Sequence, residues 1–247
     1  MAPVEVDLGT GVRAACTTVA DGNLALHALA GAGDDAARVM VRRREVGDWF
    51  GGRLSFGHQV HGVVTRYVTG GESDPGTDPT ARHDAVEPCD ALVTDDPRVA
   101  LAVLVADCVP VLLADRRAGV IGVAHAGRPG MLDGVLCSVV RAMTERGADP
   151  ARIGAVLGPC AGPCCYEVPE QMADDAERRV PGVRSRTTWG TPSIDLRTGC
   201  RSQLARAGVE QVAVHGGCTI EDPVWFSYRR AAGEPTGRFA GLVRLVP

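Results

Sequence analysis

The sequence predicts an α/β protein in which helices pack on mixed sheets. Two continuous apolar runs rich in β-branched residues, 99–108 and 120–127, are typical of buried strands. Between residues 131 and 147, apolar side chains recur every three or four positions, as in a helix with one apolar face. Because hairpin-like strand pairs alternate with helical segments, both parallel and antiparallel strand neighbours are expected.

The N-terminal third of the chain predicts an opening pair of strands, a helix and two further short strands. These elements fall, in chain order, at residues 4–8, 13–19, 34–50 and 55–69. Asp34 or Asp35 can cap the start of the helix, and Gly62 breaks the last segment into its two strands. The stretch 70–88 is rich in Gly, Pro, Asp and Thr without periodicity, which predicts a surface loop that can act as a lid.

The rest of the chain continues the alternation of helices and strands. After the two central strands, the pattern predicts a helix, a strand, two helices and two strands, at residues 131–147, 152–158, 167–180, 198–208, 209–217 and 237–245. Between the first two strands of this half, Pro110 is expected to end one strand and set the next turn.

Composition predicts one enzyme-sized domain spanning residues 1–247 that acts on small molecules. With 45% hydrophobic residues, the chain can bury a large core without disulfides or metals. The net charge is −4 and no basic run exceeds Arg42 to Arg44, which argues against a nucleic-acid or membrane surface. No signal peptide or membrane-length apolar stretch is visible, so a cytoplasmic location is expected.

Nine cysteines are many for such a protein. In a reducing compartment they are buried small residues, metal ligands or nucleophiles more often than disulfides. Cys16, Cys137 and Cys200 lie in apolar or helical contexts without a nearby histidine, so they are expected to be structural.

Three short segments, each at the end of an apolar run, carry the residues best suited to chemistry. They are His61 in HQVHG, Cys108 in LVADC and His125 in GVAHAG. Side chains at the ends of neighbouring strands converge on one rim, so the three residues can form an open metal site or a catalytic Cys–His pair. Buried histidines and cysteines that only satisfy the core are the competing interpretation.

Zinc is the natural ion for two imidazoles and one thiolate. It prefers tetrahedral sites, and three protein ligands leave a fourth position open, as in catalytic zinc centres. Such an ion lowers the pKa of water toward about 7 or polarises a substrate oxygen. Copper also accepts these ligands. A multicopper laccase, however, needs many more histidines than the six in this chain.

Anion binding is predicted beside this rim. AHAGRPG joins a strand to a helix start near Gly130, where free backbone N–H groups can hold phosphate. Arg43, Arg128 and Arg229, followed by Arg230, can add forked donors, although solvated surface arginines are the alternative.

The segment GPCAGPCCYEV, residues 158–168, places three cysteines among Gly and Pro. It can form a second thiol site. A tight turn lining the pocket is favoured, because no histidine follows at zinc-finger spacing.

The order of these motifs resembles that of a known family. HQVHG, DALVT, ADCVPVLLAD, GVAHAG, GPCAGPCCYEV, CT with WFSYRR, and a closing TGR occur in succession over nearly the whole chain. In this the chain resembles the YfiH family of laccase-domain proteins, also called polyphenol oxidase or peptidoglycan editing factor (PgeF). NLALHALAGAGDDAARVMVRR is similar to the family's N-terminal segment.

The resemblance implies a purine nucleoside phosphorylase that acts on adenosine, inosine and methylthioadenosine and also deaminates adenosine. It implies a zinc ion held by two His and one Cys, which carry over onto His61, Cys108 and His125. It also implies a layered α-β-β-α sandwich with mixed sheets, similar to the catalytic domain of the cytotoxic necrotizing factor toxins. The expected partners are nucleosides and phosphate, with the protein a monomer or small homo-oligomer.

Two departures from the family bear on phosphate binding. The family usually reads AHAGWRG where this chain has Arg128 and Pro129, and it usually has Asn where this chain has Arg42, before Arg43. A guanidinium has therefore moved by one residue or been lost.

Other interpretations stay open at the level of sequence. Cys108 could be the nucleophile of a cysteine hydrolase or deamidase with His125 as its base. The editing-factor name suggests quality control of cell-wall precursors, with zinc shaping a binding site. For phosphorolysis, Asp90 and Asp107 are candidates for the general acid by position, and each can equally be a capped structural carboxylate.

Overall fold

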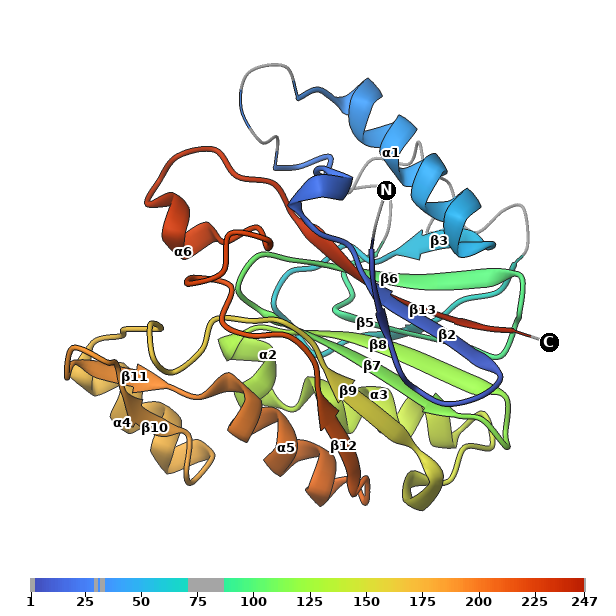
Figure 1. Cartoon of the computed structure of the whole chain (residues 1–247). Helices are drawn as coiled ribbons and strands as arrows, with labels where there is room; N and C mark the ends of the chain where they lie inside the picture. The colour runs from blue at the N-terminus through green and yellow to red at the C-terminus, as the bar shows by residue number, and fades with distance from the viewer. Residues whose placement is uncertain (1–2, 29–30, 32–33, 71–86, 247) are drawn as a thin grey trace.

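Two main sheets lie face to face in this computed structural model, with helices on both outer faces (Figure 1). The structure describes residues 3–28, 31, 34–70 and 87–246. One sheet has five strands in the order β1-β2-β13-β6-β3, and the other has six in the order β12-β9-β7-β8-β5-β4. Helix α1 covers the first sheet, and α2, α3 and α5 cover the second. The predicted layered α-β-β-α sandwich is confirmed.

The strands are β1 (Val4–Val6), β2 (Val12–Cys16), β3 (Arg53–Phe56), β4 (Thr65–Tyr67), β5 (Ala91–Thr94), β6 (Val99–Val105), β7 (Val109–Asp115), β8 (Val120–Ala126), β9 (Gly154–Leu157), β10 (Arg184–Arg186), β11 (Pro192–Ile194), β12 (Gln211–Val214) and β13 (Phe239–Leu245). The α-helices are α1 (Ala36–Phe50), α2 (Arg128–Asp133), α3 (Val135–Thr144), α4 (Glu170–Arg179), α5 (Leu196–Arg206) and α6 (Tyr228–Ala231).

Both large sheets are mixed. The pairs β3–β6, β4–β5 and β9–β12 are parallel, whereas the central pairs β7–β8, β7–β9 and β6–β13 are antiparallel. Strands β10 and β11 form a separate antiparallel pair. The expected mixture of hairpin-like and crossover connections is therefore present.

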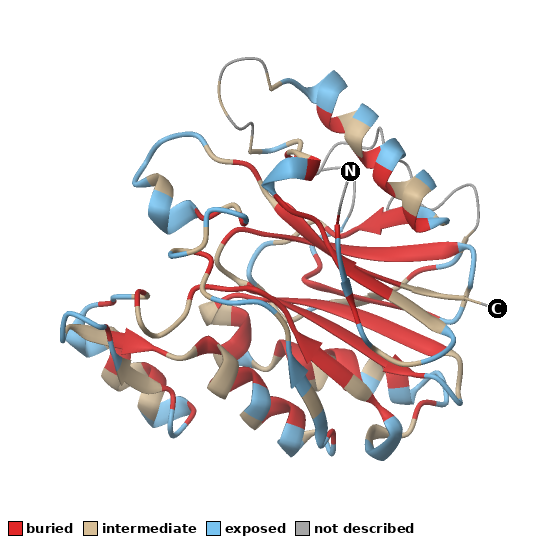
Figure 2. Ribbon diagram, in the orientation of Figure 1, coloured by how far each residue is buried: buried red, intermediate tan, exposed pale blue. Residues whose placement is uncertain are grey.

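The core forms layers because side chains alternate between the two faces of each strand. On β6, Leu101 and Val103 pack between the sheets, while Ala100 and Ala102 pack toward α1. Strand β7 follows the same rule, with Val111 in the cluster that faces the helices of the second sheet. Figure 2 shows both sheets buried along most of their length.

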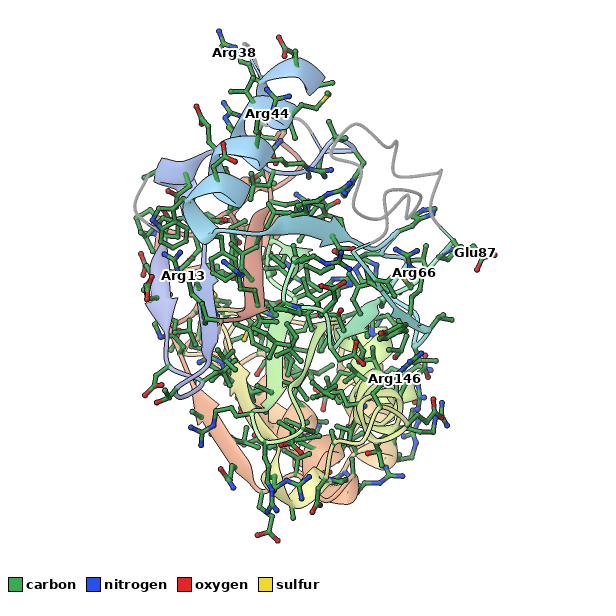
Figure 3. All side chains as sticks on the ribbon, turned by 90° about the vertical axis from the view of Figure 1, so that its right-hand side faces the viewer. Arg13, Arg38, Arg44, Arg66, Glu87 and Arg146 are labelled. Atoms are coloured by element: carbon green, nitrogen blue, oxygen red, sulfur yellow. The ribbon has the colours of Figure 1, made fainter. Side chains whose placement is uncertain are left out.

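Helix α1 begins where the sequence predicts a cap. The side chain of Asp35 accepts a hydrogen bond from the backbone N–H of Arg38 at 2.8 Å, while Asp34 instead pairs with Arg42. Figure 3 labels Arg38 and Arg44 on this helix, and both side chains are exposed.

Two predictions about element boundaries are wrong. The helix expected over 131–147 is two helices, α2 and α3, because Gly134 takes a left-handed backbone with φ 104°. Pro110 lies within β7 rather than ending a strand. It lies opposite Gly158, at the end of the pairing of β7 with β9, and its carbonyl accepts a hydrogen bond from the N–H of Gly158. It is tolerated because the carbonyl of Gly158 accepts from Arg197 in place of the N–H that proline lacks.

Four short elements were not predicted: β5, β10, β11 and α6. Each is only three or four residues long, too short to display a hydrophobic period. Of the loop predicted at 70–88, residues 71–86 lie outside the described part of the chain.

Candidate functional site

The three predicted metal or catalytic residues lie where the chain passes between the sheets. His61 is in the connection from β3 to β4, and Cys108 is in the short turn from β6 to β7. Both connections leave the five-stranded sheet and enter the six-stranded one. His125 lies near the end of β8, directly opposite Pro110 of β7. Strands far apart in sequence therefore deliver the three residues to one rim.

These residues are brought together as a compact set, here called the histidine–cysteine group. One ligand atom from each of His61, Cys108 and His125 lies within 4.8 Å of the others. Cys108 Sγ is 3.8 Å from His61 Nε2, and the two imidazole centroids are 4.7 Å apart. His125 is buried, Cys108 half-buried and His61 exposed, so the group opens to solvent on the His61 side.

A single buried carboxylate organises the group. Asp90 accepts hydrogen bonds from the backbone N–H groups of Val60, His61 and Gly62 at 2.7 to 3.1 Å. It also accepts one from Nδ1 of His125 at 2.8 Å, which leaves Nε2 as the free ring nitrogen. Burial alone would raise the pKa of Asp90, but the bond from His125 and the backbone donors lower it. All of these bonds favour a positioning role for this carboxylate.

Backbone geometry at the rim leaves little freedom. His61 and Asp107 have φ of 62° and 93°, in the left-handed region that non-glycine residues seldom adopt. Gly127 lies against the group, and a Cβ at that position would be 2.8 Å from His61 Cδ2 and 2.9 Å from Cys108 Sγ. Only glycine fits there without displacing the two side chains.

Cys108 and His125 form a charged pair when no metal is bound. Burial would raise the pKa of Cys108, yet the charge and hydrogen bond of His125, together with His61, lower it to about 6. Burial would lower the pKa of His125, but the thiolate and Asp90 raise it to about 9. At neutral pH the thiol is therefore ionised, as a nucleophile or a metal ligand requires.

The donor set suits a thiophilic or borderline metal ion. Two imidazoles and a thiolate are ligands that both zinc and copper accept, and the bond from His125 to Asp90 is the outer-sphere contact typical of metal-binding histidines. The space that Gly127 leaves beside His61 and Cys108 is consistent with a bound ion or substrate atom.

Two of the three predicted anion-binding arginines meet at one tyrosine. Burial raises the pKa of Tyr166, while the charges of Arg128 and Arg229 and a hydrogen bond with Arg128 oppose that shift. The Arg229 guanidinium lies 5.1 Å from the centre of the Tyr166 ring. The negative charge of Cys108 also raises the pKa of this phenol.

The third predicted arginine has other contacts. Arg43 is buried, its Nε donates to the carbonyl of Leu24 at 2.8 Å, and its guanidinium lies 4.1 Å above the ring of Phe56. Burial lowers the pKa of Arg43 to about 10. Among the described residues, no recorded contact links this side chain to the histidine–cysteine group.

Both carboxylate oxygens of Asp107 accept hydrogen bonds that hold the fold together. They accept from Thr219 Oγ1 at 2.6 Å and from the backbone N–H of Arg229 at 2.7 Å. These bonds join the β6–β7 turn to the segment that leads into α6. The geometry thus favours the structural interpretation for Asp107, as it does for Asp90.

The small neighbours of His125, Gly127 among them, were expected from the sequence to leave room for a substrate or ion. Tyr166 and Arg238 were quoted only as parts of motifs, Arg238 in the closing TGR, and no role was assigned to them. Arg238 has its pKa lowered by burial, and the negative charges of Cys108 and Asp107 oppose that shift. Their presence in short, distinctive motifs was the available signal.

The structural cysteines are as expected. Cys16 and Cys200 are buried, and Cys137 is partly buried with its thiol 3.6 Å from the carbonyl of Gln203. No helix within the described residues combines the length and apolarity needed to cross a membrane.

Comparison with known proteins finds close relatives along most of the chain. A purine nucleoside phosphorylase of Streptomyces coelicolor is 45% identical over 216 residues, covering 86% of this chain and 85% of the relative. One of Mycobacterium tuberculosis is 44% identical over 214 residues, covering 85% and 81%. The purine nucleoside phosphorylase YlmD of Geobacillus stearothermophilus is 34% identical over 233 residues, covering 90% and 82%.

Solved structures share the same fold. YlmD from Geobacillus stearothermophilus superposes with a TM-score of 0.84 at 31% identity, covering 96% of this chain and 93% of that one. The hypothetical protein YfiH of Bacillus licheniformis gives a TM-score of 0.85 at 30% identity, covering 99% and 97%. A family model described as "Multi-copper polyphenol oxidoreductase laccase" matches residues 11–246. The chain therefore belongs to this laccase-like family, that of the YfiH proteins.

Proposed function

We propose that this protein is a zinc-dependent purine nucleoside phosphorylase acting on adenosine, inosine and methylthioadenosine, with adenosine deamination as a side activity. The observation that carries the proposal is the gathering of His61, Cys108 and His125 into one group that can hold a metal ion. The Arg229 guanidinium above the ring of Tyr166 supplies the proposed contact for phosphate. The names of the relatives support the same reaction. The whole chain is proposed to act as one catalytic domain.

In this proposal the residues of the chain divide the work. Arg128 and Arg229 hold phosphate through forked, charge-assisted donors. A phosphate oxygen forms a bond to the anomeric carbon while the glycosidic bond between that carbon and the purine nitrogen breaks. The purine leaves with the electron pair of the broken bond and takes up a proton. Zinc held by His61, Cys108 and His125 would supply Lewis acidity near the reacting groups.

Asp90 contributes by positioning. Its bond to Nδ1 fixes the ring of His125, and its three backbone bonds fix the loop that carries His61. A prearranged site of this kind lowers the reorganisation needed during reaction. Arg43 remains a proposed phosphate contact, with its Nε already bonded to Leu24.

The test is product analysis with protein of known metal content. Adenosine incubated with phosphate should give adenine and ribose 1-phosphate, and omission of phosphate should abolish them. The variants His61→Ala and Cys108→Ala should lose this turnover while keeping the circular dichroism of the folded protein, and Cys137→Ser should retain it. Full activity in His61→Ala, or no turnover by the zinc-loaded protein, would reject the proposal.

A second candidate rests on a specific arrangement. The arrangement resembles that of cysteine hydrolases, with Cys108 as the nucleophile and His125 as its base. Asp90 is the carboxylate that orients His125. This enzyme would be inactivated by iodoacetamide and indifferent to chelators. Loss of activity on chelation, with recovery on adding zinc, would instead favour the phosphorylase.

A further inference from the structure

A second set of ligand atoms gathers outside the histidine–cysteine group. Cys164 and Cys165 lie on the loop between β9 and α4, and Cys218 and Glu221 lie between β12 and α6. Their thiol sulfurs and a carboxylate oxygen all lie within 4.8 Å of one another. We call these four residues the cysteine–glutamate group.

The contacts within this group are close and directed. Cys164 Sγ is 3.2 Å from Cys165 Sγ and 3.3 Å from Glu221 Oε2. The backbone N–H of Gly162 donates to Cys218 Sγ at 3.2 Å, a bond that stabilises a metal-bound thiolate. In a tetrahedral zinc site with bonds of about 2.3 Å, neighbouring sulfurs lie roughly 3.8 Å apart. The atoms therefore need only small shifts to surround one ion.

Backbone contacts join the two segments that carry these ligand atoms, the one after β9 and the one after β12. The backbones of Cys160 and Cys218 pair as an isolated parallel β-bridge, and both thiols are free. The N–H of Thr219 donates to the carbonyl of Cys160 at 2.9 Å. Arg197 of α5 donates to the carbonyls of Gly158 and Gly216, both at 3.0 Å. Figure 1 shows the segments that follow β9 and β12 leaving from neighbouring parallel strands. The group is thus preorganised rather than assembled from loose chain.

Core packing does not account for this group. Cys160 and Cys200 are fully buried, as structural cysteines usually are. In contrast, Cys164 and Cys218 are half-buried and Glu221 is exposed. Cys165 is buried beneath them. A cation can therefore approach the group from solvent on the side of Cys164, Cys218 and Glu221.

We propose that Cys164, Cys165, Cys218 and Glu221 bind a zinc ion of their own, distinct from that of the histidine–cysteine group. Three sulfurs and one oxygen complete a tetrahedral set, which is the closed form typical of structural zinc. Binding releases the thiol protons to solvent and changes no oxidation state. Zinc is favoured over copper(I) because the fourth donor is a hard carboxylate oxygen.

This ion would clip together two segments that border the candidate active site. The first carries Tyr166 and Glu167, and the second leads to Arg229. Arg229 Nη1 donates to the carbonyl of Glu167 at 2.7 Å, so the same two segments meet again beside the proposed phosphate site. The inference does not depend on the reaction that the protein catalyses.

The test counts metal ions per chain. The full-length protein is stripped of metal under reducing conditions and reconstituted with zinc, or with cobalt(II) as a spectroscopic substitute. Elemental analysis should find two ions per wild-type chain, and one in Cys164→Ser and Cys218→Ser. The cobalt form of these variants should lose most of its thiolate charge-transfer absorption.

Matched variants separate the two groups. His61→Ala should also retain one ion, but with the strong thiolate absorption intact, and Cys137→Ser should retain both ions. If Cys218→Ser does not fold, Glu221→Gln tests the same site from its exposed side and should weaken binding of the second ion only. One ion in the wild type, unchanged by Cys164→Ser, would overturn the proposal. So would an intact mass showing that the stripped, reduced protein re-forms a Cys164–Cys165 disulfide in place of binding metal.

Discussion

Both the histidine–cysteine group and the cysteine–glutamate group contain cysteine thiols, but the pKa of the thiol is lowered in the first and raised in the second. Beside two imidazoles, the pKa of Cys108 falls to about 6 although burial opposes this. In the other group, burial raises the pKa of Cys164, and hydrogen bonds with Cys165 and Glu221 raise it further. Without metal, Cys108 is a reactive thiolate, whereas Cys164 and Cys165 remain neutral thiols. The neighbours of a cysteine thus decide its chemistry more than its exposure does.

The largest expected effect comes from filling the space beside Cys108. Gly127→Ala would place a methyl group 2.8 Å from His61 Cδ2 and 2.9 Å from Cys108 Sγ, so both side chains must move. A displacement near 1 Å in an active site can lower kcat about 100-fold. Turnover and metal content of the first group should fall together while the second group keeps its ion. Gly154→Ala, which meets no atom within 4 Å, is the control, and an active Gly127→Ala would contradict the site.

A somewhat smaller effect is expected from the carboxylate that orients His125. Asp90→Asn removes the charge that supports the imidazole and replaces one acceptor oxygen with a donor. Loss of an outer-sphere partner typically costs about 10- to 100-fold in metal affinity or activity. Zinc titration with a competing chelator measures the change. The control is Asp95→Asn, because the carboxylate of Asp95 accepts a hydrogen bond from Tyr67, outside the site. This variant should bind zinc normally, and equal losses in both variants would argue against a specific role.

Alkylation compares the two groups directly in metal-free protein. A lowered pKa means that Cys108 is ionised above about pH 6, whereas raised values keep Cys164 and Cys165 protonated through neutral pH. At pH 7, iodoacetamide should label Cys108 at least roughly tenfold faster, after allowing for the lower nucleophilicity of an acidic thiol. Peptide mass spectrometry follows each site. Equal alkylation rates at pH 7 would contradict the proposed difference in pKa between Cys108 and the cysteines of the second group.

The smallest expected effect concerns the arginine that both groups border. Arg229→Gln removes the charge near Tyr166 and the bond to the carbonyl of Glu167. Loss of one charge-assisted hydrogen bond costs about 1.5 kcal/mol, so the KM for phosphate should rise roughly tenfold with a smaller change in kcat. Initial rates at varied phosphate measure it. The exposed Arg178→Gln is the control, and an unchanged KM would exclude Arg229 from phosphate binding.

Local sequence patterns predicted much of this fold because period and length are local properties. The runs over β6 and β8 and the amphipathic face of α3 were predicted from side-chain spacing alone. The break at Gly134 was missed because the apolar spacing continues across it, although the backbone there is left-handed. Pro110 was misjudged because whether a proline is tolerated depends on which neighbouring strand would need its N–H.

The sequence by itself identified His61, Cys108 and His125, since each ends an apolar run and each can ligate a metal or carry a proton. Only the tertiary structure decided what surrounds them. Asp90 joins His125 because β5 pairs with β8, and Cys218 reaches Cys164 because β12 lies parallel to β9. Strand order depends on the packing of the whole chain, and hydrophobic periodicity reports only which face of each strand is buried. The sequence therefore pointed only to the cysteines of residues 158–168 as a possible thiol site, and the fold added Cys218 and Glu221 to them.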